Sequence, residues 1–333
     1  MRRRAWLWLL IWLGWGVVFA ESQGGPKYEY FRSGNATDIV TAPEAGFALL
    51  GGGKDLDAAF EWLGKRAHGG DFLVLRARGD DDYDPYIEKL AKLNSVATLI
   101  VPSREAANDP FVAMAISKAE AIFIAGGDQA NYINFWKGTP VQTALNDALR
   151  RGVPMGGTSA GLAVLGEYIY SAQNDAPDDP NLSSEMALAD PFHKQVVIVR
   201  GFLNNPLLAG TITDSHFAVR NRMGRLLVFM ARIRATGATT VKGLGVDQGA
   251  AVLLEPSGRA TVIGQGAAYF LESKGEGEAV QPGRPLSFGP VESRKVEAGG
   301  TFDVKSWTGS PEVYSYRVER GVVHSSAANG AIY

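Results

Sequence analysis

The chain has 333 residues, with 33 Lys and Arg against 35 Asp and Glu, and a formal net charge of -2. This balance gives no electrostatic reason to expect nucleic acid or a membrane surface as a partner. The chain contains no cysteine, which excludes disulfides, a thiolate nucleophile and thiolate metal ligands. Its four histidines lack the close spacing of a metal site, so we expect no metal and no cofactor.

Residues 1–20 have the pattern of a secretory signal peptide. A basic start, MRRR, precedes the apolar run AWLWLLIWLGWGVV, and the small Ala20 suits cleavage directly after it. The alternative is an uncleaved anchor, but the apolar run is shorter than the ~20 residues that a membrane span requires. We therefore expect an exported chain, periplasmic or extracellular, with no stable membrane association after cleavage. Residues 21–44 then form an N-terminal segment.

From residue 45 to about residue 265, short apolar runs alternate with amphipathic stretches. We expect strands at 46–50, 71–77, 95–102, 121–125 and 153–157, and helices at 54–67, 83–93, 109–119, 130–136 and 140–152. Strand and helix in alternation indicate an α/β domain, 45–265, with a mostly parallel sheet flanked by helices.

The alternation breaks after Asn174. Residues 175–191 indicate a loop insertion, and the apolar pattern resumes at 196–202 and 209–217. After Val246, the sequence has the pattern of short strands separated by Gly and Pro. We expect these strands to complete the sheet, and residues 266–333 to form a β-rich C-terminal extension.

Three glycine turns, at 51–53, 126–127 and 156–157, each follow a predicted strand. Ligands of parallel sheets bind beyond the carboxyl ends of the strands, so the three turns should share the ligand-binding edge. The third turn continues into GTSAG, a Gly-x-Ser-x-Gly pattern that can hold a serine nucleophile on a sharp turn. Ser159 is therefore a candidate nucleophile; the alternative is an ordinary serine in a glycine-rich loop.

A hydroxyl nucleophile needs a base, and His216 has the best position of the four histidines. It follows a predicted strand, on the edge where Ser159 is expected, with one acid and three arginines nearby: Asp214, Arg220, Arg222 and Arg225. Guanidinium groups bind carboxylates in a bidentate manner, so the three arginines suit a substrate carboxylate. The alternative is a basic helix face paired with surface acids.

Three segments, FIAGGDQ, GGTSAGLAVLG and TDSHFAVRNRMGRLL, resemble the cyanophycinase and aspartyl dipeptidase family of serine peptidases, and GLGVDQGAAV extends the resemblance. The resemblance implies a glutamine-amidotransferase-like, flavodoxin-like three-layer fold and a Ser-His-Glu triad that acts on aspartyl or β-aspartyl bonds. It implies that Ser159 is the nucleophile and His216 the base. It also implies that Gln129 contacts the substrate, within a polar cluster that contains Asp214, Ser215, Arg220, Arg222 and Arg225. The backbone N–H groups of Gly127 and Ala160 would form the oxyanion hole.

The chain departs from this family at two positions. Ser215 replaces the glutamine before the histidine, and Gln248 occupies the position of the triad acid. A glutamine carbonyl can accept the imidazole Nδ1 proton, as Asn does in papain-like proteases, but it does not stabilise an imidazolium by charge. An acid from the insertion, such as Asp179, Glu185 or Asp190, is the other candidate for this role. Asp247 is not, because adjacent strand residues point to opposite faces.

We therefore expect an exported serine peptidase that cleaves Asp-containing or cyanophycin-like peptides. The alternative is a catalytically impaired, peptide-binding homologue, because of Gln248. A glutamine amidotransferase is disfavoured, since its nucleophile is a cysteine and the chain has none. A lipase-type hydrolase leaves the GGDQ segment and the arginines unexplained. The expected partner is a peptide with an aspartyl carboxylate, and a homodimer is compatible with the sequence.

Overall fold

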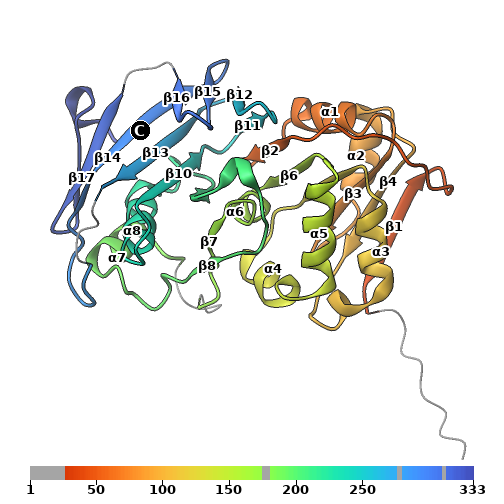
Figure 1. Ribbon diagram of the computed structural model, residues 1–333, viewed down its shortest axis with the longest axis horizontal. Coiled ribbons are helices and arrows are strands. Elements are labelled where there is room, and N and C mark those ends of the chain that lie inside the picture. Colours follow the sequence, from red (N-terminus) through yellow and green to blue (C-terminus); the bar gives the residue numbers. More distant parts are fainter. Residues whose placement is uncertain (1–26, 175–180, 276–279, 310–312) are drawn as a thin grey trace, which may run out of the picture.

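The computed structural model describes residues 27–174, 181–275, 280–309 and 313–333. The predicted signal peptide and Asp179 lie outside these residues. The chain forms two sheets that lie side by side, with helices packed on both (Figure 1). In the part of the chain that is described, no helix combines the length and the apolar character that a membrane span requires.

The first sheet has the strand order β1-β4-β3-β5-β6-β2-β11-β12-β15-β16. Its centre is parallel and contains β2 (Phe47–Leu50), β3 (Asp71–Arg76), β4 (Ser95–Ile100), β5 (Ala121–Ile124) and β6 (Met155–Thr158). Antiparallel strands extend both sides: β1 (Glu29–Gly34), β11 (Ala250–Leu254), β12 (Arg259–Gly264), β15 (Thr301–Asp303) and β16 (Thr308–Gly309). The parallel core with helices between its strands confirms the predicted α/β class.

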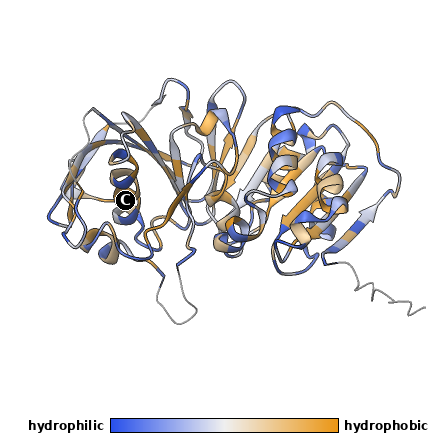
Figure 2. Cartoon of the chain, turned by 60° about the horizontal axis from the view of Figure 1, so that its bottom comes forward, coloured by the Kyte–Doolittle hydropathy of each residue, from blue (hydrophilic) through white to orange (hydrophobic). Residues whose placement is uncertain are grey.

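Helices cover both faces of this parallel core. One apolar cluster packs α1 (Asp57–Arg66) and α2 (Tyr83–Leu90) on one face. Another packs α3 (Pro110–Lys118), α4 (Gln129–Trp136) and α5 (Pro140–Arg150) on the other. Strands that are buried on both faces consist of continuous apolar runs, which is why the sequence predicted the strands of this region. Figure 2 shows these strands mostly in the hydrophobic colour, between helices in which hydrophilic and hydrophobic residues alternate.

The second sheet has the order β18-β17-β14-β13-β10-β9-β7-β8. Its strands are β7 (Tyr168–Tyr170), β8 (Ile198–Arg200), β9 (Thr211–Asp214), β10 (Thr240–Val246), β13 (Ala267–Lys274), β14 (Phe288–Glu297), β17 (Tyr314–Glu319) and β18 (Val322–Ser325). The helices α7 (Ser184–Ala189) and α8 (Met223–Arg234) pack against it through a third apolar cluster.

This second sheet differs from the expectation that the later strands complete a single sheet. β11 and β12 join the first sheet, whereas β7 to β10 belong to the second, in which β10 pairs with β13 of the C-terminal region. The predicted boundary at residue 265 therefore falls between β10 and β13, which hydrogen-bond to each other along their whole length. Apolar alternation indicates that a segment is a strand, but it does not specify the neighbour with which that strand pairs.

A buried ion pair connects β9 to α8. One edge of the Arg225 guanidinium binds both carboxylate oxygens of Asp214, with Nε 2.7 Å from Oδ2 and Nη2 2.6 Å from Oδ1. Arg222 Nη1 lies 3.2 Å from Asp214 Oδ1. Burial alone would raise the pKa of Asp214, but the charges of Arg225 and Arg222 and their hydrogen bonds outweigh it and hold the pKa below its usual value. Asp214 is therefore ionised at neutral pH and depends on these partners.

We expect the substitution Arg225→Gln to lower the free energy of unfolding by roughly 3–5 kcal/mol, because it leaves a buried carboxylate without its main partner. Arg220→Gln is the matched control, since Arg220 is exposed and makes no side-chain ion pair with any described residue. Urea denaturation of both variants measures the difference. Equal losses of stability in the two variants would contradict a structural role for the Asp214–Arg225 pair.

Candidate active site

All the predicted site residues except His216 and Gln248, which lie behind Ser159, line one cavity of about 190 Å³. It lies where β5, β6 and β9 end, at the carboxyl edge that parallel sheets use for ligands. Nine of the residues singled out in the sequence line it: Gly127, Gln129, Ser159, Ala160, Asp214, Ser215, Arg220, Arg222 and Arg225. Tyr170 and Asn181 also line this cavity, and no sequence pattern had marked them.

Ser159 follows β6 directly and precedes the short helix α6 (Ala160–Ala163). Its backbone has φ 53° and ψ −111°, which L-residues rarely adopt. The two flanking glycines make this turn feasible. A Cβ at Gly161 would lie 1.9 Å from the Ile124 carbonyl oxygen, and one at Gly157 would lie 2.5 Å from Gly161. The Gly-x-Ser-x-Gly pattern therefore reflects a close approach of α6 to the strands.

His216 follows β9, on the second sheet, and its side chain reaches Ser159. The Ser159 Oγ lies 2.9 Å from His216 Nε2. The backbone N–H of His216 donates to Gly51 O at 2.7 Å, which fixes the histidine against the first sheet. A Cβ at Gly52, where φ is +91°, would lie 2.4 Å from Nε2, so this position must be glycine to leave room for the imidazole.

Gln248 holds the other ring nitrogen of His216. Its Oε1 lies 2.9 Å from His216 Nδ1. A carbonyl oxygen is an acceptor, so Nδ1 must carry the proton in this bond, and the Nε2 of a neutral ring is then free to accept from the serine hydroxyl. Gly53 accommodates the glutamine, since a Cβ there would lie 2.4 Å from Gln248 Cγ. The structure thus forms a continuous Ser159–His216–Gln248 chain.

The acids considered as replacements are engaged elsewhere. Glu185 accepts from the Asn221 side-chain amide, and Asp190 accepts from two backbone N–H groups. Asp247 likewise accepts from two backbone N–H groups, on the opposite side of the turn. Asp179 lies outside the described residues. Among the residues described, the imidazole hydrogen-bonds to Ser159 and Gln248 and to no carboxylate.

The environment of His216 favours the neutral imidazole. Burial lowers the pKa of His216 below its ordinary 6.5, and the charges of Arg220 and Arg222 act in the same direction. The hydrogen bond to Gln248 and the charge of Asp214 oppose this shift without reversing it. The ring can therefore accept a proton at neutral pH.

The three arginines do not contribute equally to the cavity. Arg225 is occupied by Asp214, and Arg222 donates to the Ser215 carbonyl at 2.8 Å as well as to Asp214. Arg220 is exposed and makes no side-chain hydrogen bond or ion pair with any residue that the structure describes. It is therefore the arginine best able to bind a substrate carboxylate.

The predicted oxyanion donors also lie at the cavity. Ala160 is the first residue of α6, where backbone N–H groups have no partner within the helix. Gly127 adopts φ +151° in the turn after β5. Gln129 begins α4, and its Nε2 lies 3.5 Å from the Tyr170 carbonyl oxygen. Within the described ranges, no group of three His, Asp or Glu side chains is arranged to hold a metal ion.

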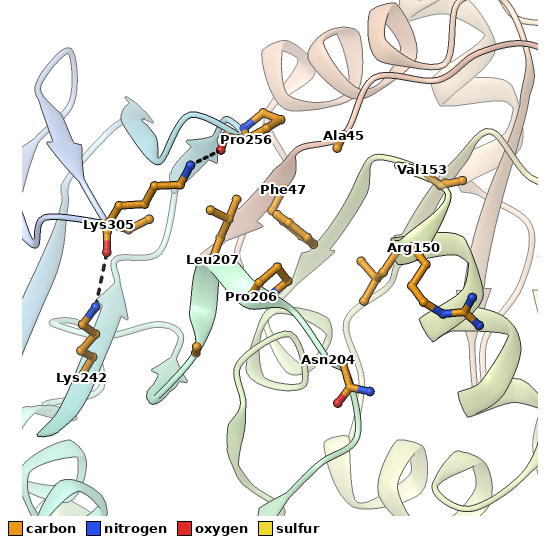
Figure 3. A pocket seen from close by; sticks show the side chains of 13 residues that line it. Ala45, Phe47, Arg150, Val153, Asn204, Pro206, Leu207, Lys242, Pro256 and Lys305 are labelled. Atoms are coloured by element: carbon orange, nitrogen blue, oxygen red, sulfur yellow. Dashed lines mark hydrogen bonds between the residues drawn. The ribbon is translucent and has the colours of Figure 1, made fainter. Parts of the chain in front are cut away.

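A second, larger cavity of about 750 Å³ lies at the opposite ends of these strands (Figure 3). Phe47 and Val153, near the starts of β2 and β6, line it together with Leu207, Lys242 and Lys305. None of the residues predicted to take part in catalysis lines this cavity. The smaller cavity, with Ser159 in its wall, is therefore the candidate active site.

The chain is similar to cyanophycinases. It is 29% identical to that of Trichormus variabilis over 172 residues, which are 51% of each chain. It is also 29% identical to that of Synechococcus elongatus over 177 residues, 52% of this chain and 48% of the relative. The match thus spans about half the length of these curated relatives.

A solved structure of a peptidase from an acI-B1 Actinobacterium aligns with 79% of this chain and 98% of its own, at 16% identity and a TM-score of 0.48. Residues 76–258, more than half of the chain, match peptidase family S51. This match includes Ser159, His216 and Gln248 and both strands that carry the first two. The chain therefore belongs to peptidase family S51.

Proposed function

We propose that this chain is an exported serine peptidase that cleaves aspartyl or β-aspartyl bonds in Asp-containing or cyanophycin-like peptides. The observation that carries the proposal is the hydrogen bond between Ser159 Oγ and His216 Nε2 in the wall of a cavity lined by Arg220. Membership of a peptidase family and similarity to cyanophycinases support it.

The geometry suits acyl transfer through a covalent intermediate. Ser159 Oγ attacks the scissile carbonyl carbon while His216 Nε2 takes the hydroxyl proton. The Ala160 and Gly127 N–H groups bind the oxyanion of the tetrahedral intermediate. The intermediate collapses as His216 returns the proton to the leaving amine, and water then hydrolyses the acyl-enzyme by the same steps. Gln248 keeps the imidazole in the required tautomer and orientation.

The charge around the cavity favours an acidic substrate. Arg222 and Arg225 share one carboxylate, Asp214, so the group retains net positive charge even before Arg220 is counted. Burial lowers the pKa of Arg222 to about 10, so it remains a cation at neutral pH. A substrate carboxylate next to Arg220 would neutralise part of this positive charge.

A catalytically impaired, peptide-binding homologue is the second candidate. The observation that favours it is the neutral amide of Gln248 on His216 Nδ1, because an amide does not stabilise the imidazolium that forms during proton transfer. The two candidates differ in turnover, and both predict binding of acidic peptides at the same cavity.

Export rests on the pattern of residues 1–20, which predicts cleavage after Ala20. We propose a periplasmic or extracellular location for the mature chain on this basis. A homodimer is compatible with this site, because one chain supplies the whole Ser159–His216–Gln248 arrangement.

We expect Ser159→Ala and His216→Ala each to reduce hydrolysis of β-aspartyl dipeptides by at least about 10³-fold, because each removes an essential member of the nucleophilic pair. Labelling by a fluorophosphonate probe should also disappear in Ser159→Ala. His193→Ala is the control, since His193 lies in another part of the fold. Wild-type rates in both site variants would refute the mechanism.

The pH dependence of kcat/KM tests the role of Gln248. In the wild type, activity should fall only as the pH drops through a His216 pKa below 6.5, because the neutral ring is the base. In Gln248→Glu, the new carboxylate should raise this pKa, move the acidic limb to higher pH and increase kcat roughly ten-fold or more. An unchanged or lower kcat in Gln248→Glu would count against the impaired homologue.

Arg220→Gln should raise KM for an aspartyl peptide by roughly ten-fold and have little effect on the Asn analogue, because it removes a charge-assisted contact to the carboxylate. Steady-state kinetics with the matched Asp and Asn peptides measure this. An equal change for both peptides would show that Arg220 does not recognise the carboxylate.

A further inference from the structure

Residue 333 contacts the loop that carries the candidate base. The Tyr333 hydroxyl accepts a hydrogen bond from the backbone N–H of Met223 at 2.8 Å. The same hydroxyl donates to Asn221 Oδ1 at 3.1 Å. These two contacts lie at the end of the loop 216–223, which begins at His216 and contains Arg220 and Arg222.

The ring of Tyr333 supports the same loop through apolar contacts. It packs edge-to-face against Phe217, with the centroids 5.9 Å apart, and against Tyr269 of β13 at 5.8 Å. Phe217 is fully buried and directly follows His216. The segment that precedes Tyr333 is itself anchored, because the Tyr316 hydroxyl of β17 donates to the Ile332 carbonyl at 2.6 Å.

The loop needs such support because its backbone is strained. His216 has φ 46° and Asn221 has φ 48°, in the left-handed region that L-residues rarely adopt. Residues in sparsely populated conformations persist when their surroundings determine them from several sides. Asp247 supports this loop from one side, through a hydrogen bond from the Ala218 N–H at 2.9 Å. Tyr333 supports it at the other end.

We propose that Tyr333 is a positioning residue for the reaction, which holds the loop 216–223 in the conformation that presents His216 to Ser159 and Arg220 to the cavity. The support comes from the C-terminal β region, well beyond residue 258, where the family match ends. Tyr333 thus connects the C-terminal β region to the loop, next to Tyr269 of β13, which also packs against Phe217. Burial raises the pKa of Tyr333 to about 12, so its hydroxyl stays protonated and can donate to Asn221 at neutral pH. This role in the reaction rests on the proposed peptidase function.

The substitution Tyr333→Phe tests the proposal, because it keeps the ring contacts and removes both hydrogen bonds. Hydrogen–deuterium exchange should be about 5- to 10-fold faster in peptides that cover residues 217–223. Fluorophosphonate labelling of Ser159 and kcat/KM for the best aspartyl peptide should fall by a similar factor. Tyr333→Ala, which also removes the ring, should have a larger effect on all three measurements.

Tyr86→Phe is the matched control. It removes a tyrosine hydroxyl that donates to Asp57 at 2.7 Å on the distant face of the first sheet, and should change none of these measurements. Unchanged exchange in Tyr333→Phe would overturn the proposal, as would faster exchange with unchanged labelling and kinetics. A wild-type protein that neither hydrolyses peptides nor reacts with the probe would refute the peptidase function instead. The exchange data would still decide whether Tyr333 holds the loop.

Discussion

The site depends on a close backbone approach between the two sheets. Ser159 extends from a strand of the first sheet and His216 from a strand of the second, and the backbone of Gly51, after β2 of the first sheet, contacts both His216 and the end of β10 in the second. The Gly51 carbonyl accepts the His216 N–H, and a Cβ at Gly51 would lie 2.0 Å from the Asp247 carbonyl oxygen. A side chain at this position would therefore push residues 246–247 of the second sheet away from the first, and the absence of a Cβ at Gly51 allows the close approach.

Local patterns predicted those parts of the structure that local physics determines. The apolar runs of the parallel strands and the Gly-x-Ser-x-Gly turn are visible in the sequence, because buried strands and a strained turn restrict which residues can occupy them. The assignment of β9 and β10 to a second sheet was not visible, since a strand pattern carries no information about its partner. The sequence also did not show which carboxylate Arg225 binds. Three nearby arginines suggested a substrate carboxylate, whereas the guanidinium of Arg225 binds Asp214 of the same chain.

Gln248 gives the site an unusual electrostatic balance. In a triad with a carboxylate, the acid compensates the imidazolium that forms when the serine loses its proton. In this chain, the negative charge that would stabilise the imidazolium comes from Asp214, which already binds two arginines. The cavity therefore has an excess of positive charge, and an acidic substrate would supply part of the negative charge that the triad lacks. Under the proposed mechanism, recognition of the substrate and activation of the base would be electrostatically coupled.

The assembly of one hydroxyl and one imidazole from separate sheets has a mechanical consequence. The two sheets share part of one apolar core, because the cluster that contains the parallel strands also contains Leu244, Val246 and Phe270 of the second sheet. The 2.9 Å contact between Ser159 and His216 therefore depends on how the two sheets pack against each other. A substitution in this shared core that moved one sheet by about an ångström would lengthen the hydrogen bond beyond its usual range, even if every strand and helix remained folded.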